Sequence, residues 1–222
     1  MLIRQIILTA TLAASLMEGS MDACLPSMDA EGTLFLVNRQ TRIVSEYTPM
    51  TVKTETPGGR SMRADAAQAL QEMFSAARQE AKISLTTVSG YRSYSKQSVL
   101  YSNKINSTGS VAKAQKYVAP PGASEHQLGL AMDLGSTKSG GQLNSSFGKS
   151  KGGQWVRQNA HRFGFIVRYQ EGWEDITGYN YEPWHVRYVG VEHATAMYEQ
   201  NIPFEIYIRS LQGKALADIL EP

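Results

Sequence analysis

The sequence of 222 residues contains a single cysteine, Cys24, which excludes an internal disulfide and a cysteine-rich zinc site. Histidine and carboxylate side chains are therefore the ligands left for a metal ion. The chain has no dense lysine and arginine run interleaved with aromatic residues, and its formal net charge is only +2. A nucleic-acid partner is therefore not indicated.

The apolar run Ile6–Met17 is shorter than the ~20 residues that a membrane-spanning helix needs. It follows a short basic start and resembles the apolar region of a signal peptide. We therefore expect residues 1–30 to be an N-terminal extension, with export to the cell envelope or beyond and transient membrane contact through this segment. A buried or amphipathic N-terminal helix is the alternative.

Hydrophobic residues make up 42% of the chain, which is enough to bury a sizeable core. We expect residues 31–222 to form one domain and the protein to be a monomer. Apolar residues recur at helical spacing from Arg63 to Lys82, and the alternating segment Ile83–Val88 predicts a strand. A helix is expected to begin near Ser95, with a polar loop over residues 103–110.

Two separated clusters carry metal-binding chemistry. His126 and Asp133 stand seven positions apart in Ser-Glu-His-Gln-Leu-Gly-Leu-Ala-Met-Asp, and small residues between them allow a tight backbone path. Glu182-Pro183-Trp184-His185 adds a second imidazole and a free carboxylate. Two histidines and one aspartate make a three-ligand zinc site that keeps a position open for water, with Glu182 as general base. Residues three apart point to opposite faces of a regular strand, so Pro183 is expected to bend the chain there.

These motifs, SEHQLGLAMD and YEPWHVRYVG with SGYRS upstream, resemble the D-alanyl-D-alanine carboxypeptidase family. Its VanY-like members are zinc peptidases that trim peptidoglycan stem peptides. The resemblance implies an α+β domain in which helices pack on a small, mainly antiparallel sheet, with Zn²⁺ in a surface cleft. It also implies an opening strand at Leu34–Asn38.

Arg92 follows the predicted strand directly, so we expect it to anchor the terminal carboxylate of a peptide, which a guanidinium group binds bidentately. The resemblance further implies that Ser124, Gln97, Tyr101 and Tyr169 contact the substrate. Ser124 lacks the Gly-x-Ser-x-Gly setting of a serine hydrolase nucleophile.

The expected reaction is zinc-dependent release of the C-terminal D-alanine from a stem peptide that ends in D-Ala-D-Ala. An L,D-carboxypeptidase acting on the tetrapeptide stem is the first alternative, because pocket shape decides the bond. A cell-wall-binding module without catalysis is the second, although the presence of Glu182 disfavours it. A structural zinc site is disfavoured because no fourth Cys or His lies nearby.

Overall fold

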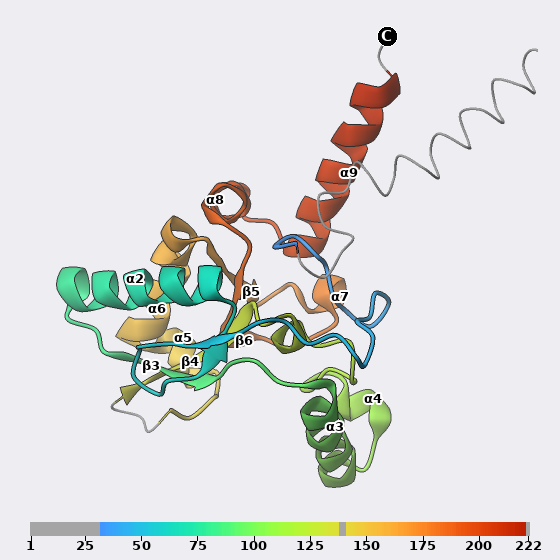
Figure 1. The fold of residues 1–222 in the computed structure, drawn as a ribbon, viewed down its shortest axis with the longest axis horizontal. Coiled ribbons are helices and arrows are strands. Elements are labelled where there is room, and N and C mark those ends of the chain that lie inside the picture. Colours follow the sequence, from blue (N-terminus) through green and yellow to red (C-terminus); the bar gives the residue numbers. More distant parts are fainter. Residues whose placement is uncertain (1–31, 138–140, 221–222) are drawn as a thin grey trace, which may run out of the picture.

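The structure, a computed structural model, describes residues 32–137 and 141–220, without the side chains of 215–220. The expected N-terminal extension and Cys24 lie outside the described residues. A four-stranded sheet has the order β3-β4-β6-β5, and a separate two-stranded sheet pairs β1 with β2 (Figure 1). The strands are β1 Val52–Lys53, β2 Ser61–Met62, β3 Leu85–Ser89, β4 Ala131–Ser136, β5 Phe165–Tyr169 and β6 Glu182–Tyr188.

All neighbouring strands in the larger sheet run antiparallel. Helices make up most of the remaining regular structure. They are α2 Ala64–Ala81, α3 Tyr94–Thr108, α4 Val111–Ala114, α5 Ser146–Lys149, α6 Lys151–Asn159, α7 Glu174–Thr177, α8 Val191–Gln200 and α9 Phe204–Leu220, with 3-10 turns η1 Glu125–Leu128 and η3 Ala160–Phe163. The predicted α+β class with a small antiparallel sheet is confirmed. None of the helices in the described part of the chain is long and apolar enough to cross a membrane.

Helix α2 confirms the helix predicted from the apolar spacing after Arg63. Its buried face includes Leu70 and Met73, both fully buried, and belongs to the main core cluster. The helix ends where Lys82 takes a left-handed conformation with φ 58°. The buried face of α2 therefore packs on one face of the four-stranded sheet. The opposite face of that sheet remains available for a site.

The side chains of β4 point alternately into the core and toward the site. Met132 and Leu134 belong to the core cluster that contains α2 and α6 side chains. Asp133 lies between them and points to the opposite face, because successive strand residues alternate. The strand therefore carries a buried carboxylate out of an apolar layer.

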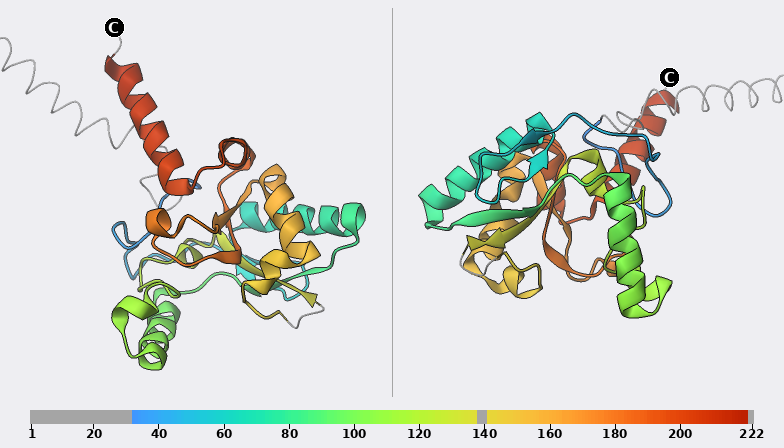
Figure 2. Two further views of the ribbon diagram at one scale, coloured as in Figure 1. Left: turned by 180° about the vertical axis from the view of Figure 1, so that it is seen from behind. Right: turned by 60° about the horizontal axis from the view of Figure 1, so that its bottom comes forward.

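Helices α3 and α4 stand at one end of the sheet, whereas α9 extends away from the body of the molecule (Figures 1 and 2). Helix α3 runs through the predicted loop at 103–110, so that prediction was wrong for its first part. Ser93 caps the helix by accepting a hydrogen bond from the Lys96 amide, and Gly109 ends it at φ 65°. These two end signals outweigh the polar composition between them.

The opening strand expected at Leu34–Asn38 is also wrong, because this segment is irregular. Its backbone serves a different purpose: Arg187 Nη2 donates to the carbonyl oxygens of Thr33 and Phe35, at 2.8 and 3.0 Å. These carbonyl groups therefore bind a buried cation instead of a neighbouring strand.

Candidate metal centre and active-site cleft

The three predicted metal ligands lie together, although they come from three elements. His126 is in the turn η1, Asp133 is on β4, and His185 is on β6 directly opposite Asp133 in the strand register. One donor atom of each side chain lies within 4.8 Å of the others. All three residues are buried, with 1%, 4% and 4% of their surface exposed.

A hydrogen bond to the backbone sets the orientation of the His126 ring. Its Nδ1 lies 2.7 Å from the carbonyl oxygen of Gly90, so Nδ1 donates and Nε2 keeps its lone pair. Nε2 is buried and makes no hydrogen bond to a described residue, although Asp133 Oδ2 is 3.4 Å away. Burial and the nearby Arg92 charge lower the pKa of His126 to about 4, so the ring is neutral at neutral pH.

The His185 ring lies between two carboxylates. Nδ1 is 3.2 Å from Asp133 Oδ1, and Nε2 is 3.1 Å from Glu125 Oε2. Burial opposes a charged ring here, but the hydrogen bonds to Asp133 and Glu125 outweigh it and raise the pKa of His185 to about 9. With Nε2–H held by Glu125, Nδ1 is the nitrogen that faces the other two candidate ligands.

These residues fit a zinc ion. The buried Nε2 of His126 lacks a partner and faces Asp133, and two imidazole nitrogens with one carboxylate oxygen are a donor set that zinc accepts. Each histidine also has a hydrogen-bond acceptor at its other nitrogen, which fixes the ring as in established zinc sites. The geometry therefore supports a metal centre of His126, Asp133 and His185.

The sequence reasoning missed Glu125, which is buried and central to this arrangement. Its Oε1 accepts hydrogen bonds from Arg168 Nε at 2.8 Å and from Arg187 Nη1 at 3.2 Å, while Oε2 faces His185. Burial alone would raise the pKa of Glu125, but the two guanidinium groups hold it well below its ordinary value. Arg168 also pairs with buried Glu205 on α9, at 2.9 Å. The only sequence signal was that Glu125 directly precedes the predicted ligand His126.

Glu182 lines the same cleft as the candidate ligands. Val167 pairs with Val186 and Tyr169 with Glu182, so two steps along β5 match four along β6. This irregularity contains Pro183, and it allows Glu182 and His185 to face one cleft despite their odd spacing. Burial, with a smaller contribution from Asp133, raises the pKa of Glu182 to about 7, against the opposing effect of His185. A carboxyl group with this pKa can exchange a proton near neutral pH.

The cleft has a volume of about 520 Å³ and brings Arg92, Ser124 and Tyr169 to the candidate metal ligands. Within the described part of the chain, the Arg92 side chain donates only a long hydrogen bond, from Nη1 to Ser89 Oγ at 3.4 Å, and its buried Nε has no partner there. The Tyr169 ring lies 4.9 Å from the His185 ring. Arg92 therefore offers unused donors to an anion in the cleft.

Gln97 and Tyr101 do not line the cleft. Gln97 is fully buried and donates through Nε2 to the carbonyl oxygen of Ala119 at 2.7 Å. Tyr101 accepts a hydrogen bond at its hydroxyl oxygen from Gln115 Nε2, at 2.9 Å. Ala119 does line the cleft, so Gln97 supports the cleft wall through this bond, and contact of Gln97 or Tyr101 with a substrate stays a prediction.

Tyr179 is a further cleft residue that the sequence reasoning passed over. The Arg39 guanidinium lies 4.9 Å from the Tyr179 ring centre, and the buried Tyr179 hydroxyl has no partner among the described residues. Burial raises the pKa of Tyr179 to about 12, so the hydroxyl stays protonated. No sequence motif indicates Tyr179, because its contact with Arg39 joins two segments that are distant in the chain.

Comparison with known proteins agrees with this geometry. The sequence model of the family described as VanY, D-alanyl-D-alanine carboxypeptidase, matches residues 59–191. The chain belongs to the VanY family. One relative, the putative carboxypeptidase YodJ of Bacillus subtilis, is 42% identical over 190 residues, which cover 82% of this chain and 69% of the relative.

Two solved structures extend the VanY likeness to the fold. The LdcB LD-carboxypeptidase is 41% identical with a TM-score of 0.77, and the match covers 82% of this chain and 88% of that one. A vancomycin resistance D,D-pentapeptidase VanY, solved in complex with Zn(II), is 35% identical with a TM-score of 0.69 over 79% of this chain and 98% of that one. The structures similar to this chain thus include both an LD-carboxypeptidase and a D,D-pentapeptidase.

Proposed function

We propose that this chain is a zinc-dependent carboxypeptidase that releases the C-terminal D-alanine from peptidoglycan stem peptides, with the D-Ala-D-Ala bond as the first candidate. The observation that carries the proposal is one cleft with three convergent metal donors, a separate carboxylate and an arginine with unused donors. Membership of the VanY family supports the same reaction class. Export to the cell envelope is part of the proposal, because stem peptides lie outside the membrane.

Each group of the cleft has a role in hydrolysis. A zinc ion held by His126, Asp133 and His185 would act as a Lewis acid toward water and the scissile carbonyl. Glu182 accepts the proton of the attacking water and passes it to the leaving amine as the C–N bond breaks. Arg92 binds the free carboxylate of the last residue, and Ser124 and Tyr169 help to fix that residue in the cleft. Cleavage one residue from the end follows from this anchor.

The L,D bond of a tetrapeptide stem is the second candidate. The likeness to the LdcB LD-carboxypeptidase favours it, because identity and TM-score are both higher than for the D,D-pentapeptidase. The residues proposed for catalysis would serve either bond, since both peptides end in a free D-alanine carboxylate.

The deciding experiment measures zinc content and D-alanine release from two purified peptides, one ending in D-Ala-D-Ala and one in L-Lys-D-Ala, with and without chelator. Chelator-sensitive release is the expected result, and the faster peptide identifies the bond. Bound zinc with no release from either peptide would contradict the carboxypeptidase and favour a binding module.

A further inference from the structure

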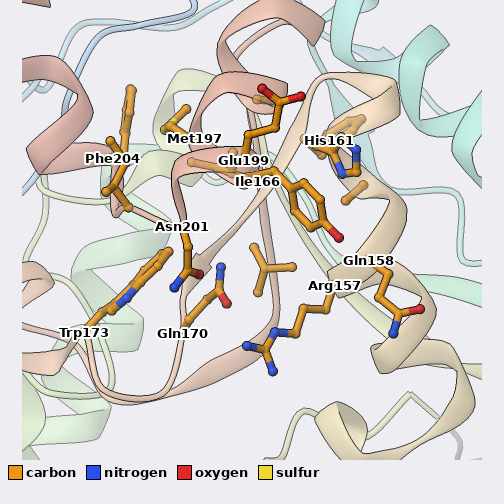
Figure 3. A pocket seen from close by; sticks show the side chains of 16 residues that line it. Arg157, Gln158, His161, Ile166, Gln170, Trp173, Met197, Glu199, Asn201 and Phe204 are labelled. Atoms are coloured by element: carbon orange, nitrogen blue, oxygen red, sulfur yellow. The ribbon is translucent and has the colours of Figure 1, made fainter. Parts of the chain in front are cut away.

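A second cavity of about 450 Å³ borders β5 and shares no lining residue with the cleft (Figure 3). Its walls come from the end of α6 with η3, from β5 and the turn after it, and from α8 with the residues that lead into α9. Tyr169 lines the cleft, whereas the next residue, Gln170, lines this cavity. The α8 wall lies beyond residue 191, where the family match ends. The volume falls within the ~300–1,000 Å³ usual for small-molecule sites.

The inner surface of the cavity is apolar. Phe165, Ile166, Met197 and Phe204 contribute buried side chains to it, with no more than 9% of any of them exposed. His161 stacks on Tyr198 with ring centres 3.8 Å apart and an interplanar angle of 10°. This surface favours the apolar face of a ligand ring.

The polar side chains around the cavity are mostly neutral and unpaired. The amide groups of Gln158, Gln170 and Asn201 make no side-chain hydrogen bond to a described residue, and Figure 3 shows them around the cavity with Trp173 and Arg157. Each amide supplies both donors and an acceptor.

The charge of the lining is balanced, because Arg157 and Glu199 have opposite signs. Burial, with a smaller contribution from the Arg162 charge, lowers the pKa of His161, which disfavours the charged ring. Its buried Nδ1 has no partner among the described residues. A neutral ligand with hydroxyl and amide groups therefore fits better than an ion.

We propose that this cavity binds an N-acetylated amino sugar, as part of a glycan chain. The aromatic and aliphatic surface would pack against the C–H face of the sugar ring, and the three amides would bind its hydroxyl and acetamido groups. The inference rests on the proposed function, because stem peptides are attached to glycan chains of such sugars. Sugar binding here would hold the polymer while the cleft acts on the attached peptide.

The test is calorimetric titration of the zinc-loaded full chain with tri-N-acetylchitotriose, and with cellotriose as the sugar that lacks acetamido groups. We expect saturable binding of chitotriose and at least ten-fold weaker binding of cellotriose. Trp173→Ala and Gln170→Leu should each weaken chitotriose binding at least ten-fold. The matched control, Gln68→Leu on the exposed face of α2, should bind as the wild type does.

Lack of saturable chitotriose binding overturns the proposal, as does equal binding of cellotriose or an unchanged affinity in Gln170→Leu. If Trp173→Ala does not fold, Gln170→Leu decides alone, because Gln170 lies outside both core clusters. D-alanine release is measured on the same wild-type preparation. Release without sugar binding refutes only this inference, whereas sugar binding without release refutes only the carboxypeptidase.

Discussion

At the scale of single residues, Glu182 has the most specific role in the proposed reaction. Glu182→Gln keeps the shape of the side chain but cannot accept a proton, so kcat should fall by about 10²–10⁴-fold. Zinc content should stay unchanged, because Glu182 is not among the candidate ligands. Turnover and metal content are measured together, with Glu192→Gln on α8 as an exposed control. A kcat near that of the wild type would remove Glu182 from the role of base.

Glu125 pairs with the buried Arg168 and Arg187 and also orients the His185 ring. Glu125→Gln should weaken zinc binding by about 10–100-fold, because the carboxylate that orients His185 is lost. It should also lower the free energy of unfolding by about 3–5 kcal/mol, since Arg168 and Arg187 lose their buried anion. Zinc titration and urea unfolding measure the two effects.

The control for Glu125→Gln is Glu80→Gln, which breaks the exposed ion pair with Arg162. It should change neither zinc affinity nor stability appreciably. Wild-type zinc affinity in Glu125→Gln would mean that the carboxylate does not position His185.

Arg92 is expected to decide which peptides are substrates. Arg92→Ala should lower kcat/KM for a peptide with a free C-terminus by at least ~30-fold, which corresponds to ~2 kcal/mol of lost charge pairing. The same peptide with an amidated C-terminus should be affected much less. The measurement compares both peptides in the variant and in the exposed control Arg78→Ala. Equal losses on both peptides would exclude the carboxylate anchor.

At the scale of elements, the turn η1 positions His126, and this turn ends at Gly129 in a left-handed backbone conformation. Gly129 has φ 70°, and an added Cβ would lie 3.3 Å from side-chain atoms of Arg63, Pro49 and Thr51. Gly129→Ala should therefore cost at least ~1–2 kcal/mol of stability and displace His126.

Gly109→Ala is the matched control for Gly129→Ala. Gly109 ends α3 at φ 65°, and an added Cβ would meet no atom within 4 Å. Both variants should unfold at a lower temperature, but only Gly129→Ala should lose zinc. Thermal melting and metal analysis distinguish the two effects, and full zinc occupancy in Gly129→Ala would contradict the role assigned to the turn.

At the scale of the whole molecule, zinc binding should stabilise the fold, because its three ligands join η1, β4 and β6. Ligand present at 100 times its dissociation constant contributes ~2.7 kcal/mol. Chelation should therefore lower Tm, and added zinc should restore it. His126→Ala should melt at the same temperature with and without chelator. A wild-type Tm that does not respond to chelator would argue against bound zinc.

The sequence by itself determined the family, and it named the donor side chains that the structure brings together in the candidate site. Helix α2 was predictable because its core face repeats with helical spacing, and β3 because its residues alternate and favour extended structure. The meeting of His126, Asp133 and His185 was predictable because two short motifs contain nitrogen and carboxylate donors of the kind that zinc accepts, whereas the role of Glu182 as base stays a prediction.

Only the tertiary structure decided which other side chains meet these residues. Glu125 accepts hydrogen bonds from Arg168 and Arg187, and the Arg39 guanidinium lies over the Tyr179 ring. These contacts join segments that are distant in the chain, so no periodic pattern in the sequence indicates them. Gln97 shares a helix with cleft residues yet turns inward to Ala119. Local spacing specifies the face of an element, but packing between elements determines what that face contacts.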